Sequence, residues 1–254
     1  MACTSDSPDH ILRSRIEDTV RLCNKRGVPC FLGFLDLHEQ AYTQQLLRYN
    51  AGDVTVSFFG GYPEAERTLM CVSPSYYSVE QYEFPLCSIA FRYRTQKKLT
   101  HRDVLGTLMN LGIKRDAVGD ILCGEGLSVV FVRDEIAPYI FEQVQRIGGE
   151  GVMVLPDYDG ELPIHTDYES IRESVASPRA DSIVKALIRC SREQAADMIR
   201  LGSVSINHIP IDSVSKAINE GDTVSIRGFG RFHIDQIGPL TKKGRLTLLA
   251  RRRL

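Results

Sequence analysis

The sequence lacks any long apolar run. No stretch approaches the 18 apolar residues that a membrane-spanning helix requires. The first ten residues have neither the basic start nor the apolar core of a signal peptide. These absences argue against a membrane-spanning protein, and we expect a cytoplasmic protein without a membrane partner.

Paired cysteines are also absent. The seven cysteines are odd in number, scattered along the chain, and never spaced as Cys-x-x-Cys. That distribution indicates reduced thiols, and it argues against a disulfide framework or a zinc knuckle. We therefore predict no metal site and no cofactor, with most of the cysteines acting as small core residues.

No catalytic pattern is recognisable. The tripeptide His-Arg-Asp at 101–103 occurs in kinase catalytic loops, but the glycine-rich loop, the lysine-bearing strand and Asp-Phe-Gly are missing. We instead expect Thr100 to cap a helix whose first turn holds Asp103. No serine, histidine and acid are spaced to suggest a nucleophile. The sequence therefore predicts no catalytic residue, no enzyme activity and no small-molecule substrate.

A glycine-rich loop at residues 60–63, Gly-Gly-Tyr-Pro, is not a phosphate-binding loop, because no Lys-Ser/Thr follows it. Glu64, Glu66 and Arg67 crowd beside it. Two interpretations stay open at this point, a rigid turn with salt bridges and a loop that contacts a partner.

Charge is nearly balanced over the whole chain but unevenly distributed. The formal net charge is −1 for 254 residues. Residues 179–254 hold 14 Lys and Arg against 7 Asp and Glu, a net +7, and the rest of the chain carries −8. The C-terminal end is therefore suited to a polyanionic partner.

Residues 177–207 carry two helical patterns followed by a strand. We expect Ser177 to cap the first helix, with Pro178 at its first position and apolar residues recurring at three- and four-residue spacing. Ser191 caps a second helix that Gly202 closes. A basic helical face of this kind suits phosphates. Five cations stay on the outer faces: Arg179, Lys185, Arg189, Arg192 and Arg200.

The preceding segments predict an α+β protein with two further domains. Residues 1–82 read as two helices and a β-hairpin, with strands at 54–59 and 67–72. Residues 83–156 alternate as β-α-β-β-α-β, the ferredoxin-like order. Residues 157–176 are acidic and rich in Asp, Pro and Ser, and we interpret them as a linker to the basic domain at 177–254, which extends into further strands.

The basic domain resembles the RNA-binding domain first seen in ribosomal protein S-four, the alpha-L motif. The matching residues are Arg179-x-Asp181, Ser191-Arg192-x-x-Ala195, Ile199-x-x-Gly202-x-Val204-x-Ile206-Asn207 and Gly221-Asp222. Ala180 and His208 depart from the usual pattern, and neither change removes a cation.

The whole chain resembles the YlmH family of bacterial proteins. The residues that carry this resemblance are 56–67, 101–106, 111–115, 119–121 and 227–232. The resemblance implies a cytoplasmic protein whose C-terminal domain binds RNA, associated with ribosomes and with rescue or quality control of stalled large subunits. Structured RNA, rRNA or tRNA, and a ribosomal subunit are the expected partners.

Phosphate contacts would supply most of the affinity for RNA, and a few polar groups would add specificity. Arg227 and Arg231 lie in a stretch that matches half of an RNA-recognition motif, but in the wrong domain for it. The expected RNA-binding residues are Arg179, Lys185, Ser191, Arg192, Gln194, Ala195, Arg200, Asn207, Arg227, Arg231, Lys242 and Lys243.

Two other functions stay open. One is an RNA-modifying enzyme of the pseudouridine synthase or methyltransferase type, since such enzymes often carry this RNA-binding domain. The other is an adaptor whose acidic part binds protein while the basic end tethers it to RNA or to an anionic membrane surface. The sequence does not decide whether the central domain, with its cluster Arg92, Arg94, Lys97, Lys98 and Arg102, touches RNA.

Overall fold

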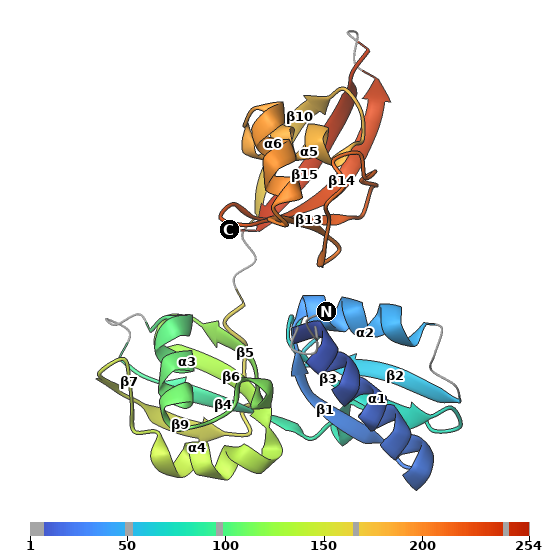
Figure 1. The fold of residues 1–254 in the computed structure, drawn as a ribbon. Helices are drawn as coiled ribbons and strands as arrows, with labels where there is room; N and C mark the ends of the chain where they lie inside the picture. The colour runs from blue at the N-terminus through green and yellow to red at the C-terminus, as the bar shows by residue number, and fades with distance from the viewer. Residues whose placement is uncertain (1–7, 49–52, 95–98, 165–167, 241–243, 254) are drawn as a thin grey trace, which may run out of the picture. The chain divides into compact units, whose positions relative to one another are not determined.

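The computed structural model describes residues 8–48, 53–94, 99–164, 168–240 and 244–253 (Figure 1). The chain forms two compact units, Met1–Ile164 and His165–Leu254. We call them the N-terminal and the C-terminal unit. Within the described residues, no helix combines the length and the apolar character needed to cross a membrane.

The N-terminal unit begins with an antiparallel sheet and two helices. The sheet has the strand order β1-β3-β2, and its first strand follows directly on the first helix. The two expected helices are confirmed. The bounds are α1 Pro8–Arg26, β1 Cys30–Leu35, α2 Leu37–Leu47, β2 Val54–Phe59 and β3 Thr68–Pro74.

Strand β1 was not expected from the sequence. Pro29 and Gly33 at and near its start obscure the strand pattern, yet its residues pair with Thr68–Pro74 across a bulge between Leu32 and Phe34. The bulge lets neighbouring side chains of β1 serve different cores. Leu32 faces the helices, and Phe34 faces the opposite side.

The second part of the N-terminal unit has the predicted ferredoxin-like order. Its sheet runs β5-β6-β4-β9, so the first and third strands of the motif are central. The second helix of the motif, α4, is short, because the chain after it turns at Gly148 and Gly149 into a small hairpin, β7–β8. The bounds are β4 Leu86–Arg92, α3 His101–Asn110, β5 Val118–Cys123, β6 Leu127–Arg133, α4 Ala137–Gln143, β7 Arg146–Ile147, β8 Glu150–Gly151 and β9 Met153–Pro156, with short 3-10 turns at Gln81–Glu83, Arg115–Ala117 and Asp134–Ile136.

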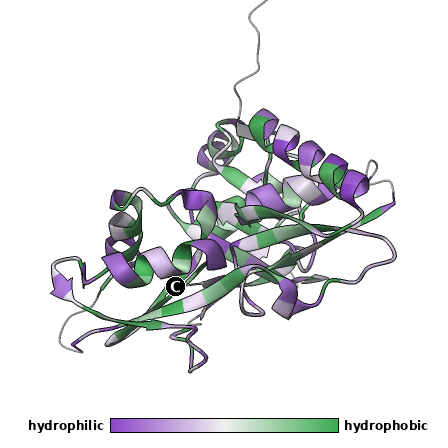
Figure 2. Cartoon of the chain, turned by 90° about the horizontal axis from the view of Figure 1, so that it is seen from below, coloured by the Kyte–Doolittle hydropathy of each residue, from purple (hydrophilic) through white to green (hydrophobic). Residues whose placement is uncertain are grey.

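The two sheets of the N-terminal unit share one core. Helix α1 covers one face of the first sheet, and α3 and α4 cover one face of the second. The remaining two faces pack on each other through residues such as Phe34, Leu69, Val129 and Phe131, all at most 3% exposed. The first two predicted domains therefore form one body of four layers, helix, sheet, sheet, helix. Figure 2 shows the hydrophobic colour concentrated on the strands and mixed colours along the helices.

The C-terminal unit is a six-stranded antiparallel sheet with two helices. The strand order is β10-β15-β14-β13-β11-β12, and α5 and α6 contribute to one apolar core with the sheet (Figure 1). The bounds are β10 Tyr168–Val175, α5 Ala180–Ile188, α6 Arg192–Arg200, β11 Val204–Ile206, β12 Ile209–Pro210, β13 Thr223–Ile226, β14 Gly230–Leu240 and β15 Leu246–Arg253.

The expected linker at 157–176 needs correction. Its second half forms the edge strand β10, which pairs along its length with β15. Its first half packs against the N-terminal unit through Tyr158, Leu162 and Ile164. The acidic composition concealed the alternation of Ile171 and Val175 with polar residues, which is the pattern of a half-covered strand.

Gly61 provides a test of the shared core. Its φ is +100°, and a Cβ there would collide with the ring of Phe131. We expect Gly61→Ala to lower the free energy of unfolding by about 1–2 kcal/mol for the left-handed backbone and by a further ~1–3 kcal/mol for overpacking. Denaturant unfolding of the full chain measures this effect.

Gly112→Ala is the matched control for Gly61→Ala. Its φ is +79°, and a Cβ there would have nothing within 4 Å, so only the backbone contribution should appear. Equal losses of stability in the two variants would contradict the close contact between the two sheets.

Candidate nucleic-acid interface

Helices α5 and α6 meet at a short connection that Ser191 organises. The Ser191 hydroxyl accepts a hydrogen bond from the Gln194 amide at 3.0 Å, and the Gln194 side chain accepts one from the Ser191 amide at 2.9 Å. This reciprocal capping box satisfies two backbone groups at the start of α6. Both residues are exposed, so their predicted contact with RNA would be additional to a structural role.

A buried carboxylate lies between the two helices. Asp181, in the first turn of α5, has a side chain that is only 5% exposed. Its Oδ1 accepts a hydrogen bond from Arg179 Nε at 3.2 Å, and its Oδ2 accepts one from Arg192 Nε at 2.8 Å. Both guanidinium groups reach solvent, with side chains 41% and 65% exposed. One acid therefore orients two cations that come from different helices.

The charge of Asp181 is maintained by these partners. Burial by itself would raise the pKa of this carboxyl, but hydrogen bonds from Arg192 and Arg179 outweigh burial and hold the pKa below its ordinary value of 3.8. The carboxylate is therefore ionised at neutral pH, and the two arginines keep a fixed anchor.

Sequence reasoning matched Asp181 to a motif but missed this role. The signal was an acid in the first turn of an otherwise basic helix.

The other predicted residues of the helix pair fall into two groups. Lys185 and Arg200 are exposed on α5 and α6, and Arg200 pairs with Asp197 at 3.0 Å. Ala195 is fully buried in the core beneath α6. The small side chain of Ala195 therefore serves the packing of the helix pair.

Asn207 shapes the hairpin that follows the helices. Asn207 and His208 both have positive φ, as the two central residues of a type I′ turn do. The Asn207 amide donates to Asp222 at 2.8 Å, and its oxygen accepts from the Thr223 amide at 2.9 Å. Asn207 thus joins the turn to the start of β13, which accounts for the Asn and Gly-Asp positions of the motif.

Two further predicted cations, Arg227 and Arg231, belong to the strand region around β13 and β14 and not to α5 or α6. Arg231 alternates along β14 with the buried residues Phe232 and Ile234, so it lies on the sheet face opposite the helices, where it lines a hollow of about 320 Å³. Arg227 is exposed before the turn to β14. Lys242 and Lys243 lie outside the described residues.

The glycine-rich loop of the N-terminal unit is a structural junction. Asp120 on β5 accepts hydrogen bonds from the Tyr62 hydroxyl at 2.8 Å and from the backbone amides of Glu66 and Arg67 at 2.7 and 3.0 Å. The loop therefore caps the interface of the two sheets, as the rigid-turn interpretation expects.

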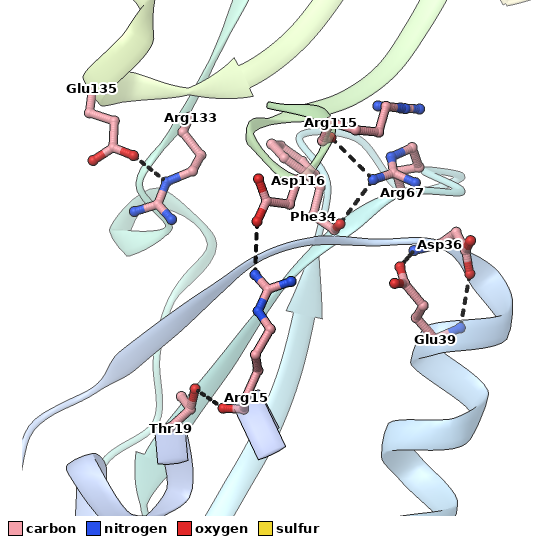
Figure 3. Close-up of polar contacts among 10 residues, drawn as sticks. All are labelled: Arg15, Thr19, Phe34, Asp36, Glu39, Arg67, Arg115, Asp116, Arg133 and Glu135. Atoms are coloured by element: carbon pink, nitrogen blue, oxygen red, sulfur yellow. Dashed lines mark hydrogen bonds and ion pairs between the residues drawn. The ribbon is translucent and has the colours of Figure 1, made fainter. Parts of the chain in front are cut away.

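Arg67 completes that junction. Its guanidinium donates to the carbonyl oxygens of Phe34 and Arg115, which come from both halves of the N-terminal unit (Figure 3). Arg15 on α1 adds an ion pair with Asp116 at 2.8 Å. Burial, together with the nearby Arg67, lowers the pKa of Arg115 to about 10. Arg67 and Arg115 both stay charged at neutral pH.

The start of α3 matches the structural interpretation of the His-Arg-Asp tripeptide. Thr100 and Asp103 form a capping box, and the hydrogen bonds from Thr100 lower the pKa of Asp103. Arg92, Arg94 and Arg102 are exposed near this end of the sheet, whereas Lys97 and Lys98 lie outside the described residues. The flat faces of the ferredoxin-like sheet are covered, so a base-stacking platform is not available on it.

Comparisons with known proteins agree with this architecture. A family model described as "Putative RNA-binding domain in YlmH" matches residues 78–157, and the S4 domain model matches residues 179–224. "Ribosome-associated protein quality control protein P2" of Bacillus subtilis (strain 168) is 32% identical over 212 residues, covering 83% of this chain and 82% of that protein. The chain belongs to the YlmH family. The resemblance seen in the sequence is thereby confirmed.

A solved structure shows a related fold. The cell division protein ylmH from Streptococcus pneumoniae is 20% identical, with a TM-score of 0.52, over 61% of this chain and 94% of that one. At this identity the likeness concerns the fold alone. In this YlmH-family chain the S4 match stops at residue 224, so β10, β14 and β15 extend the S4 domain beyond its family model.

The buried carboxylate leads to a prediction on stability. Asp181→Asn keeps the shape of the side chain but removes its charge. We expect the free energy of unfolding to fall by at most about 1.5–3 kcal/mol for each of the two charge-assisted hydrogen bonds. The folded-state pKa is depressed, so the stabilisation is present above pH 3.8 and is lost as pH falls below it. Urea unfolding from pH 7 to pH 3 should show that the difference in free energy of unfolding between the unaltered protein and Asp181→Asn becomes smaller as the pH falls.

Asp197→Asn is the control for Asp181→Asn. Asp197 pairs with Arg200 but is 57% exposed. An exposed ion pair contributes about 0–1 kcal/mol, so its loss should change stability little. If Asp181→Asn behaves like this control, Asp181 does not anchor the two arginines.

Proposed function

We propose that this protein binds structured RNA of the ribosomal large subunit, rRNA or tRNA seated on it, and acts in quality control or rescue of stalled translation. The observation that carries the proposal is the Arg179–Asp181–Arg192 arrangement on an S4 domain. The role in quality control draws on the name of the Bacillus subtilis relative. Such a role is non-enzymatic and cytoplasmic.

The geometry favours recognition of a phosphate backbone. Planar guanidinium groups bind phosphate oxygens in pairs, and a group that is already oriented loses less freedom when it binds. Asp181 orients Arg179 and Arg192, and Lys185 and Arg200 extend the cationic surface along the same helices. Specificity would then come from RNA shape and from polar groups such as Ser191 and Gln194.

Co-sedimentation with separated ribosomal subunits across a salt series tests this function. We expect the full chain to pellet with the large subunit. In Arg192→Ala/Arg200→Ala the affinity should fall, and the plot of log affinity against log salt should become shallower by about 2, because two phosphate contacts are lost.

Arg13→Ala/Arg21→Ala is the matched control for that double variant. Both arginines are exposed on α1, and each has a carboxylate partner on the same helix, as Arg200 does. The same change of charge in the N-terminal unit should leave the slope of log affinity against log salt unchanged. Equal losses in the two double variants would indicate unspecific charge attraction, and absence of pelleting with the large subunit would overturn the proposal.

Asp181→Asn gives a second, opposite test of charge against geometry. The substitution makes the protein more positive, so attraction to a polyanion would strengthen binding. If Asp181 orients the two arginines, binding to the large subunit should instead weaken, by roughly the fivefold that 1 kcal/mol represents. Tighter binding by the variant would refute the orienting role.

A further inference from the structure

A second cationic feature lies where the S4 helices meet the strands outside the family model. A hollow of about 550 Å³ opens between α5, the start of α6, β10 and the turn before β15. Its charged lining comprises four cations and one acid: Lys185, Arg189, Arg192, Arg245 and Glu173. The hollow therefore combines residues of the S4 match with residues of the strand extension.

Arg189 occupies an unusual backbone position in this lining. It ends α5 with φ +52°, the left-handed conformation in which glycine ordinarily ends a helix. An arginine there is conformationally less favourable than glycine, and its side chain is 83% exposed, so helix termination alone does not explain it. The side chain points to a role for the guanidinium itself.

Glu173 shows what kind of group the hollow accepts. Its carboxylate lies 3.1 Å from Arg189, and among the described residues that line the hollow Glu173 is the one acid. A phosphate carries comparable oxygens and more charge, so it can replace the carboxylate as partner of Arg189. Arg245 is held in place by donating to the Ser174 carbonyl, on the strand that also carries Glu173.

We propose that this hollow binds a backbone phosphate of the RNA and that Glu173 occupies the position of that phosphate in the free protein. The proposal rests on the proposed function and deepens it, because it extends the RNA contact from the helix pair onto β10 and the turn before β15. Lys185, Arg189, Arg192 and Arg245 donate to the phosphate oxygens, and the Glu173 carboxylate withdraws into solvent.

The first test removes Arg189 and Arg245, two of the three lining cations that lie outside the Asp181 arrangement. Arg189→Gly removes the guanidinium and introduces glycine, the residue best suited to a left-handed helix end. The midpoint temperature of thermal unfolding should therefore be unchanged or higher. Combined with Arg245→Ala, it should make the salt dependence of large-subunit binding shallower by about 2. Affinity should fall by roughly tenfold at 0.1 M salt, on the order of two lost phosphate contacts.

Arg172→Ala is the control for loss of charge on the same strand. Arg172 neighbours Glu173 on β10, so its side chain leaves the opposite face of the sheet, and it is exposed. We expect it to bind as the unaltered protein does. A loss equal to that of Arg189→Gly would overturn the proposal in favour of general charge attraction.

Glu173→Gln tests the exchange between carboxylate and phosphate. Removing the internal competitor should tighten binding to the large subunit by about threefold, in the range of one exposed ion pair. The same variant should bind inorganic phosphate more tightly. The amide chemical shifts of Ser182 and Arg189 in the full chain measure this binding. Unchanged or weaker binding of both probes would contradict the exchange.

The outcomes separate this proposal from the function on which it rests. If Arg192→Ala/Arg200→Ala weakens binding but Arg189→Gly/Arg245→Ala does not, the RNA-binding function stands and the phosphate site in the hollow falls. If the unaltered chain does not bind ribosomal subunits, the proposed function falls. The phosphate titration then decides on the hollow alone, with shifts at Ser182 and Arg189 supporting an anion site and no shifts overturning it.

Discussion

The C-terminal unit depends on the compensation of one buried charge. A carboxylate as enclosed as Asp181 is unfavourable unless charged donors satisfy it. The two donors here are Arg179, the N-cap of α5, and Arg192, the first residue of α6. Their hydrogen bonds fix the start of α5 against the start of α6. The same bonds leave the outer faces of the two guanidinium groups in solvent. Under the proposed function, one arrangement of three side chains therefore combines a structural role with RNA binding.

The N-terminal unit uses the same principle for a different purpose. Asp120 is satisfied by the glycine-rich loop, and Arg67 donates to carbonyl groups from both halves of the unit. These contacts close the rim of an apolar interface between two sheets. Closing it covers the sheet face that RNA-recognition folds leave open for stacking bases.

Local sequence patterns predicted the elements that depend on neighbouring residues. The helix caps at Thr100 and Ser191, the helix pair and the β-α-β-β-α-β order all follow from such patterns. The predicted cap at Ser177 was wrong, because α5 begins at Ala180 with Arg179 in the N-cap position. Strands β1 and β10 were missed because they are stabilised by partners 33 or more residues away in the chain, β3 for β1 and β15 for β10. The role of Asp181 was missed for a related reason, since burial is a property of the packed structure.

Pairing of arginines with acids separates fixed from exchangeable contacts in the C-terminal unit. Each ordered arginine side chain loses about 2 kcal/mol of rotamer entropy, so a carboxylate that already holds it reduces the cost of binding RNA. A phosphate cannot displace Asp181, which is enclosed and bound on both oxygens. Glu173, 31% exposed and bound to Arg189 through one oxygen, can yield its place. Under the two proposals, the depth of each acid thus determines whether its arginine is only oriented for RNA or also released to it.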